Sequence, residues 1–135
     1  MEMRVNSARQ SSMKTASFSV SLSVQDLAAS RAFYEDLGFE AMGGDASQGW
    51  LILVSGTTVI GLFQGMFEGN RLTFNPGWDQ SAQHVDPFED VRTIAARMRD
   101  RGHELGEEHL AGSGGPGSFT VTDPDGNIVL IDQHR

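Results

Sequence analysis

The sequence contains no cysteine among its 135 residues, which excludes disulfide bonds, thiolate metal sites and cysteine nucleophiles. It also lacks an apolar run near the roughly 18 residues that a membrane-spanning helix needs. The first 16 residues lack the apolar centre of a signal peptide. We therefore expect a cytoplasmic protein with no membrane partner.

Basic residues are scarce, because 10 Lys and Arg stand against 18 Asp and Glu and give a net charge of −8. Binding to nucleic acid requires a basic surface, so we expect no nucleic-acid partner. The acidic balance is compatible with a cationic ligand, but it is also common in proteins that are simply soluble. The length suits one domain with one core.

The stretch from Ser17 to Val24 alternates serine with apolar residues. A strand places successive side chains on opposite faces, so one face carries only hydroxyl groups and the other is apolar. A helix over Leu27 to Leu37 follows, capped by Asp26 and ended by Gly38. Within it, Phe33 and Leu37, with Leu27 and Tyr34 nearby, are predicted to form an inward-facing stripe.

The remainder of the chain repeats this order of elements. A strong helix start at Asp86-Pro87-Phe88-Glu89, with Asp86 as the cap, predicts a second helix that runs to Arg101. The other predicted strands are 39–42, 50–54, 57–63, 71–75, 119–122 and 128–132, with a further candidate within 103–110. Two rounds of strand, helix and three strands predict an α+β domain with helices on the outer faces of its sheets.

Three stretches resemble the vicinal-oxygen-chelate superfamily, which includes glyoxalase I, ring-cleaving dioxygenases and bleomycin-resistance proteins. They are SLSVQDLAASRAFYEDLGF at 21–39, DPFEDVRTIAARMRDRG at 86–102 and GSFTVTDPDGNIVLID at 117–132. The resemblance implies two βαβββ modules whose mixed sheet curls into a cup, the glyoxalase/bleomycin-resistance fold. We expect a flexible tail at 1–16 and one domain at 17–135, with modules at 17–64 and 70–133.

In metal-using members of that superfamily, four His or Glu side chains on the cup wall bind a divalent ion. The resemblance assigns these positions to Ser19, Gly61, Leu130 and a residue near Leu72. None of them is His or Glu. Serine is a poor ligand without carboxylate or imidazole partners, and glycine and leucine offer no side-chain donor. We therefore expect no metal and no other cofactor.

The histidines and the glycine-rich loop add little to a candidate site. None of the four histidines falls on a predicted inward strand position, and His134 is expected to be solvated. The cluster Glu107-Glu108-His109 reads either as an acid–imidazole group or, as we favour, as an exposed loop. The segment 112–117 lacks the Lys-Ser/Thr of a phosphate loop and is interpreted as a mobile loop that folds over the cup.

The candidate ligand-binding residues combine the serine face, the implied cup wall and the aromatic residues. They are Ser19, Ser21, Trp50, Gly61, Phe63, Phe74, Trp78, Leu130 and Asp132. Aromatic rings suit a small-molecule pocket, although core packing is the alternative for each of them. The serine face lines the cup or, alternatively, meets solvent or another protein.

Three functions stay open at this point. The first is a metal-free protein that binds a small organic molecule, as the drug-sequestering resistance proteins do. The second is a metal-dependent lyase, isomerase or dioxygenase of the glyoxalase type with displaced ligands, so the sequence leaves enzymatic activity undecided. The third is a protein–protein module that uses the serine face. The family resemblance also implies a homodimer.

Overall fold

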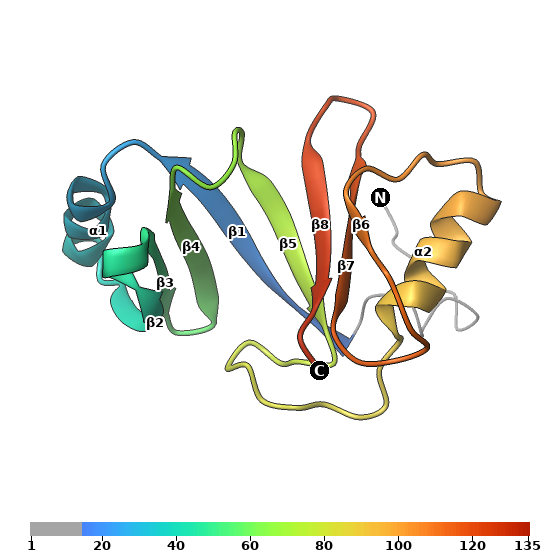
Figure 1. Ribbon diagram of the computed structural model, residues 1–135. Helices are drawn as coiled ribbons and strands as arrows, with labels where there is room; N and C mark the ends of the chain where they lie inside the picture. Colours follow the sequence, from blue (N-terminus) through green and yellow to red (C-terminus); the bar gives the residue numbers. More distant parts are fainter. Residues whose placement is uncertain (1–14) are drawn as a thin grey trace, which may run out of the picture.

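The computed structural model describes residues 15–135, which form one eight-stranded mixed sheet and two α-helices (Figure 1). Most of the expected tail at 1–16 lies outside this range, although Ala16 already belongs to the first strand. In chain order the elements are β1 (Ala16–Val24), α1 (Leu27–Asp36), β2 (Glu40–Asp45), the 3-10 turn η3 (Ala46–Gln48), β3 (Trp50–Ser55), β4 (Thr58–Gln64), β5 (Arg71–Pro76), α2 (Val91–Asp100), β6 (Glu108–His109), β7 (Gly117–Thr122) and β8 (Ile128–Gln133).

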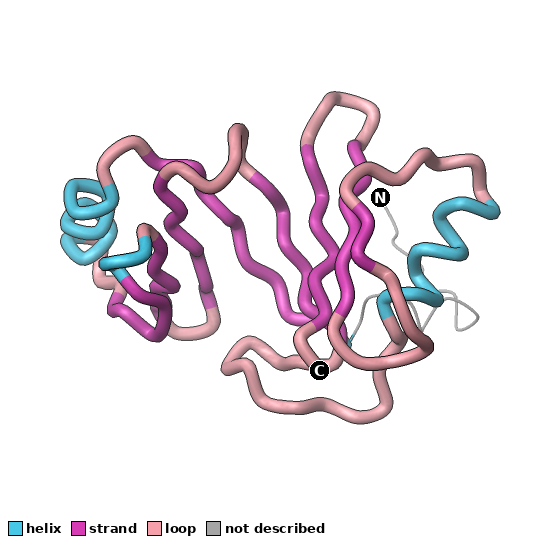
Figure 2. Tube along the Cα trace, viewed as in Figure 1, coloured by secondary structure: helices cyan, strands magenta, loops and turns pink. Residues whose placement is uncertain are grey.

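The sheet has the strand order β2-β3-β4-β1-β5-β8-β7-β6 and is not closed. The first strands of the two halves, β1 and β5, pair antiparallel at its centre. Each also pairs in parallel with the last strand of its own half, β4 or β8. The two helices lie at opposite outer ends of the molecule (Figure 2). The predicted α+β fold with paired modules and outer helices is confirmed.

Each half has its own hydrophobic core beneath its helix. In the first half, Leu27 of α1 packs with buried residues of β3 and β4, which are Leu51, Leu53, Ile60 and Leu62. In the second half, the buried residues are Val91, Ile94, Ala95, Phe119 and Ile131. Both helices are ten residues long, and neither helix of residues 15–135 has the length and hydropathy required to cross a bilayer.

Helix α1 begins as predicted, but only part of the predicted stripe faces the sheet: Leu27 is buried and Tyr34 packs against the first core. The Asp26 carboxylate accepts a hydrogen bond from the Ala29 backbone N–H at 3.0 Å, so the predicted cap is confirmed. Phe33 and Leu37 are 60% and 64% exposed, so their predicted inward position is wrong. The helix rests on β4 through Leu27 and its neighbours, and within residues 15–135 no element covers the opposite side.

Helix α2 begins four residues later than predicted, because its N-cap is not Asp86 but a later aspartate. Asp90 is the N-cap, and its carboxylate accepts from the Arg92 backbone N–H at 2.8 Å. The amide of Gln133, on β8, accepts from the Val91 N–H at 2.8 Å and donates to Asp90 at 2.9 Å. A partner more than 40 residues away in sequence therefore selects the second of two aspartates as the cap.

The glycine-rich loop at 112–117 lies against α2 and does not fold over the cup. The Arg92 guanidinium donates to the carbonyls of Ala111, Gly115 and Pro116 at 2.9 to 3.0 Å. Three backbone carbonyls bound by one side chain fix this loop on the helix side of the sheet. Its predicted position is therefore wrong.

Candidate functional site

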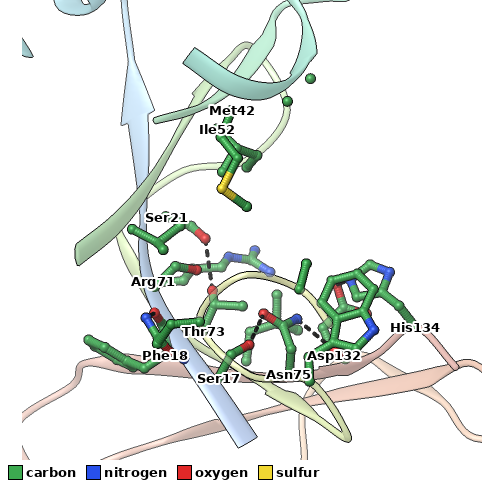
Figure 3. Close-up of a pocket in the computed structure, with 18 of the residues that line it drawn as sticks. Ser17, Phe18, Ser21, Met42, Ile52, Arg71, Thr73, Asn75, Asp132 and His134 are labelled. Carbon is green, nitrogen blue, oxygen red and sulfur yellow. Dashed lines mark hydrogen bonds and ion pairs between the residues drawn. The ribbon is translucent and has the colours of Figure 1, made fainter. Parts of the chain in front are cut away.

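A cavity of about 490 Å³ opens on the helix-free face of the central strands (Figure 3). Its wall combines residues of β1, β2, β3, β4, β5 and β8 with Phe67 and the loop at 77–85. The volume lies within the range of roughly 300–1,000 Å³ that is usual for small-molecule sites. Both halves of the sheet contribute to it, so the cavity depends on the antiparallel pairing of β1 with β5.

The floor of the cavity is set by the register of β1 and β5. Ser19 lies opposite Thr73, and Ser21 lies opposite Arg71. Directly opposed residues of an antiparallel pair share one face. The residues of β1 and β5 that line the cavity on this face are Ser17, Ser19, Ser21, Arg71, Thr73 and Asn75. The hydroxyl groups of Ser21 and Thr73 are 2.8 Å apart and hydrogen-bonded to each other.

Aromatic rings form the wall of the first half. The rings of Trp50 and Phe63 are stacked, with an interplanar angle of 4° and centroids 6.2 Å apart. The Phe67 ring follows at 5.3 Å from Phe63, and the guanidinium carbon of Arg71 lies 4.5 Å from the centroid of Phe67. The three rings therefore form a row along the wall, and the Arg71 guanidinium packs against the last ring of the row.

A second aromatic pair forms the opposite end of the cavity. The Trp78 indole is stacked on the His134 imidazole at 4.7 Å, and His134 Nε2 lies 3.2 Å from an Asp132 carboxylate oxygen. The hydrogen bond to Asp132 raises the pKa of His134 above its ordinary value, against the smaller opposing effect of burial. His134 thus lines the cavity while its side chain stays 45% exposed, so the expectation that it is solvated is confirmed, but its place at the cavity was not predicted.

The structure brings most of the predicted residues together. Those that line the cavity are Ser19, Ser21, Trp50, Phe63, Trp78, Leu130 and Asp132. Gly61 belongs to the same face, but the Phe63 ring and the Ile52 side chain lie over it, within 3.3 Å of where a Cβ would be. Phe74 does not line the cavity, because it packs against the α2 core and the Phe18 ring.

Sequence reasoning missed six polar residues of the cavity wall. Four lie on the sheet or directly after it, Arg71, Thr73, Asn75 and His134, and two lie in the loop after β5, Asp79 and Gln80. The first three alternate with Leu72 and Phe74 along β5, and this alternation groups them on one face of the strand without telling which face meets the cavity. The sequence-based prediction places the apolar positions of this strand in the cup. The fourth lies two residues beyond Asp132 and continues the cavity face of β8.

The wall does not fit the divalent metal of the superfamily. Ser19 and Leu130 line the cavity at two of the implied ligand positions, and Gly61 lies under the Phe63 ring at a third. The fourth was placed near Leu72, but Thr73 is the residue of β5 that faces the cavity there. Within residues 15–135, no three His, Asp or Glu side chains are grouped so that they could hold a metal ion. Hydroxyl groups with one Asp132–His134 pair, and with Asp79 hydrogen-bonded within its own loop, are a weak donor set for such an ion.

The family model of the Glyoxalase/Bleomycin resistance protein/Dioxygenase superfamily matches residues 17–131. The chain belongs to this superfamily, as the three sequence stretches had indicated. No curated protein sequence matches the chain. Membership defines the fold and the position of the cavity, while the activities within the superfamily differ.

Solved structures with the same fold have different activities. A superfamily member from Vibrio splendidus 12B01 is 18% identical, with a TM-score of 0.61, and the match covers 88% of this chain and 99% of that one. Methylmalonyl-CoA epimerase from Streptomyces coelicolor is 18% identical, with a TM-score of 0.59 and coverage of 91% and 99%. An extradiol ring-cleaving dioxygenase from B. fuscum is 24% identical, with a TM-score of 0.56 and coverage of 88% and 32%. At these identities the likeness shows the fold alone.

Proposed function

We propose that the protein binds a small organic molecule in the cavity between its two halves, without the divalent ion of its metal-using relatives. The observation that carries this proposal is the composition of the wall. Two aromatic stacks, Trp50 with Phe63 and Trp78 with His134, lie on either side of a floor of hydroxyl groups. Rings supply apolar contact area at low cost in side-chain entropy, and the hydroxyl groups orient polar atoms of the ligand.

A metal-dependent enzyme is the competing function, and it would require different residues in the cavity wall. Lewis-acid chemistry requires a fixed set of imidazole or carboxylate ligands. The implied ligand positions on the wall hold Ser19, Gly61 and Leu130 instead. Binding through rings and hydroxyl groups needs no such set, so it agrees better with this wall.

Both tryptophans of the chain line the cavity, which makes their indole N–H signals direct reporters of occupancy. The experiment is a screen of flat aromatic compounds against ¹⁵N-labelled protein treated with EDTA. We expect compounds that bind to shift the signals of Trp50 and Trp78 and to be recovered unchanged. Ser21→Phe, which fills the cavity, should abolish these shifts, whereas Ser113→Phe at an exposed loop position should retain them.

Two results would reject this proposal. The first is binding that appears only after Zn²⁺, Ni²⁺, Mn²⁺ or Fe²⁺ is added to the treated protein. The second is conversion of a bound compound to a product, which would favour the lyase, isomerase or dioxygenase alternative. If Ser21→Phe does not fold, Leu130→Phe at another cavity position provides the same test.

A further inference from the structure

Arg71 is a charged residue of the cavity floor whose hydrogen-bond donors are only partly satisfied by the protein. It is the first residue of β5, and its guanidinium extends into the cavity beside Ser21 and Thr73 (Figure 3). The side chain is only 11% exposed. Arginine stays protonated at any physiological pH, so a positive charge is held inside the cavity with little contact to water.

The partners of Arg71 leave part of its hydrogen-bonding capacity free. Its two terminal nitrogens lie 3.4 and 3.5 Å from the carboxylate oxygens of Glu107, which is long for an ion pair. The Glu107 side chain is 66% exposed, so water competes for it. The buried Nε atom of Arg71 has no hydrogen-bond partner within the described residues. A buried charged donor without a partner indicates a place for an acceptor.

A second buried donor belongs to the opposite end of the same cavity. The indole Nε1 of Trp78 is buried and likewise has no hydrogen-bond partner among residues 15–135. Tryptophan has only this donor, and in buried positions it usually finds a partner. Two residues that line one cavity therefore each have a buried N–H group without a partner among residues 15–135, and an oxygen acceptor would satisfy either group.

The acidic residues of the cavity already have partners on the protein. The Asp79 carboxylate accepts from the backbone N–H groups of Ser81 and Gln83 at 2.9 and 3.0 Å, within its own loop. The Asp132 carboxylate is paired with His134 at 3.2 Å. These contacts already stabilise the negative charge of both carboxylates, whereas the buried Nε of Arg71 has no partner within the described residues, so the cavity favours an anionic ligand.

We infer that the ligand is an aromatic carboxylate, whose acid group binds Arg71 and whose ring packs against Phe63 and Trp50. This inference rests on the proposed function and specifies the chemistry of the ligand. The rings of Trp50, Phe63 and Phe67 form a row that reaches Arg71. A flat apolar surface therefore lies next to the guanidinium group. The fork of a guanidinium matches the two oxygens of a carboxylate.

The test compares two ligands of the same shape, 2-naphthoate and 2-naphthamide. Each is titrated into ¹⁵N-labelled protein, and the shifts of the two indole N–H signals give the dissociation constant. We expect the wild type to bind the acid about tenfold or more tightly than the amide, because hydrogen bonds to a charged partner are worth more than neutral ones.

Substitutions at Arg71 should remove this preference without removing the cavity. We expect Arg71→Gln to bind the two compounds within about threefold of each other and Arg71→Lys to be intermediate, since lysine keeps the charge but not the fork. The matched control is Arg31→Gln, which removes an arginine paired with Glu35 on the exposed side of α1. Glu107→Gln, which removes the competing carboxylate, should tighten binding of the acid.

The outcomes separate the two proposals. Equal binding of both compounds to the wild type, or tighter binding of the amide, would overturn the inference and leave small-molecule binding supported. Failure of every aromatic compound in the screen to shift the indole signals would overturn the proposed function, and with it this inference. If Arg71→Gln does not fold, the affinities of Arg71→Lys and Glu107→Gln decide, and an unchanged acid preference in both would reject the inference.

Discussion

The indole ring of Trp78 lies parallel to the imidazole of His134, with an interplanar angle of 10° and centroids 4.7 Å apart. The first residue comes from a loop between β5 and α2, and the second follows the last strand of the sheet. Asp132 binds the far nitrogen of the imidazole at 3.2 Å. The imidazole of His134 therefore contacts both the Asp132 carboxylate and the Trp78 indole at the end of the cavity. Protonation of the imidazole changes the charge in both contacts.

The first prediction concerns the pH dependence of stability. Asp132 raises the pKa of His134 in the folded protein above the unfolded value of about 6.5. The folded state then binds the proton more tightly than the unfolded state. This contribution to stability is fully present below pH 6.5 and is lost as the pH rises through the folded pKa. We expect NMR titration of His134 to show the raised pKa directly.

The variant Asp132→Asn removes the cause of this shift. We expect the pKa of His134 to fall, and the difference in unfolding free energy between pH 5.5 and pH 8.5 to become smaller. Asp125→Asn, in the exposed turn before β8, is the matched control and should leave both quantities as in the wild type. If the titration of His134 is the same in Asp132→Asn, the ion pair does not form in solution.

The second prediction concerns Gln133, whose side chain is 1% exposed and joins β8 to the start of α2. Its amide accepts from the Val91 N–H and donates to Asp90, to the Gly115 carbonyl and to the Arg135 carbonyl at 2.8 to 3.0 Å. Gln133→Ala leaves these groups without partners in a buried place. We expect a loss of about 3 kcal/mol or more in unfolding free energy, measured by urea denaturation.

The control for Gln133 is Gln48→Ala, at an exposed position of η3. An exposed glutamine contributes little, so we expect a change within about 0.5 kcal/mol. A similarly small loss for Gln133→Ala would mean that the start of α2 does not depend on this amide.

The local sequence was sufficient for the elements that are stabilised by nearby residues. Asp26 caps α1 through the Ala29 N–H three residues away, and the alternation from Ser17 to Val24 identified β1 and its cavity face. The start of α2 could not be read in the same way. Asp86 and Asp90 both suit a cap, and the choice depends on Gln133, which is distant in sequence.

The cavity residues of β5 also could not be predicted from the local sequence alone. Its sequence alternates polar and apolar residues, so either set could have faced the cup. The pairing of Ser19 with Thr73 decides this, and it turns Phe74 to the opposite face. Register between strands far apart in sequence depends on the assembled sheet, so a pattern within one strand does not determine it.

The third prediction concerns Gln80, which holds the loop carrying Trp78 against the sheet. Its amide donates to the carbonyls of Phe18 and Thr57 at 2.9 and 2.8 Å and accepts from the Phe18 N–H. Gln80→Ala removes the partner of that N–H. We expect hydrogen exchange at Phe18 to become about tenfold faster, as the loss of a bond worth about 1.4 kcal/mol implies.

Gln83→Ala is the matched control for Gln80, because among residues 15–135 its side chain donates only to the Ser81 carbonyl, within the same loop. Exchange at Phe18 should stay as in the wild type. If both variants accelerate exchange equally, the effect is a general loosening of the loop and the contact of Gln80 with β1 is not its cause.

The fourth prediction concerns Gly61, which lies beneath the aromatic wall. A Cβ atom at this position would be 2.5 Å from Cε2 of Phe63 and 3.3 Å from Cδ1 of Ile52. Gly61→Ala should therefore push the Phe63 ring away from Trp50 and into the cavity. Because the ring is free to move, we expect a cost of only about 1–2 kcal/mol in unfolding free energy. We also expect a shifted Trp50 indole signal and at least about tenfold weaker binding of 2-naphthoate, since the ring contact is lost.

Gly114→Ala is the control for this substitution, because within residues 15–135 no atom beyond its chain neighbours lies within 4 Å of the position that its Cβ would take. It should leave the Trp50 signal and the affinity unchanged. If Gly61→Ala behaves in the same way, the Phe63 ring does not lie over the glycine in solution. The stacking of Phe63 on Trp50 would then not require glycine at position 61. The glycine that stands at this implied metal-ligand position would not be explained by the aromatic wall.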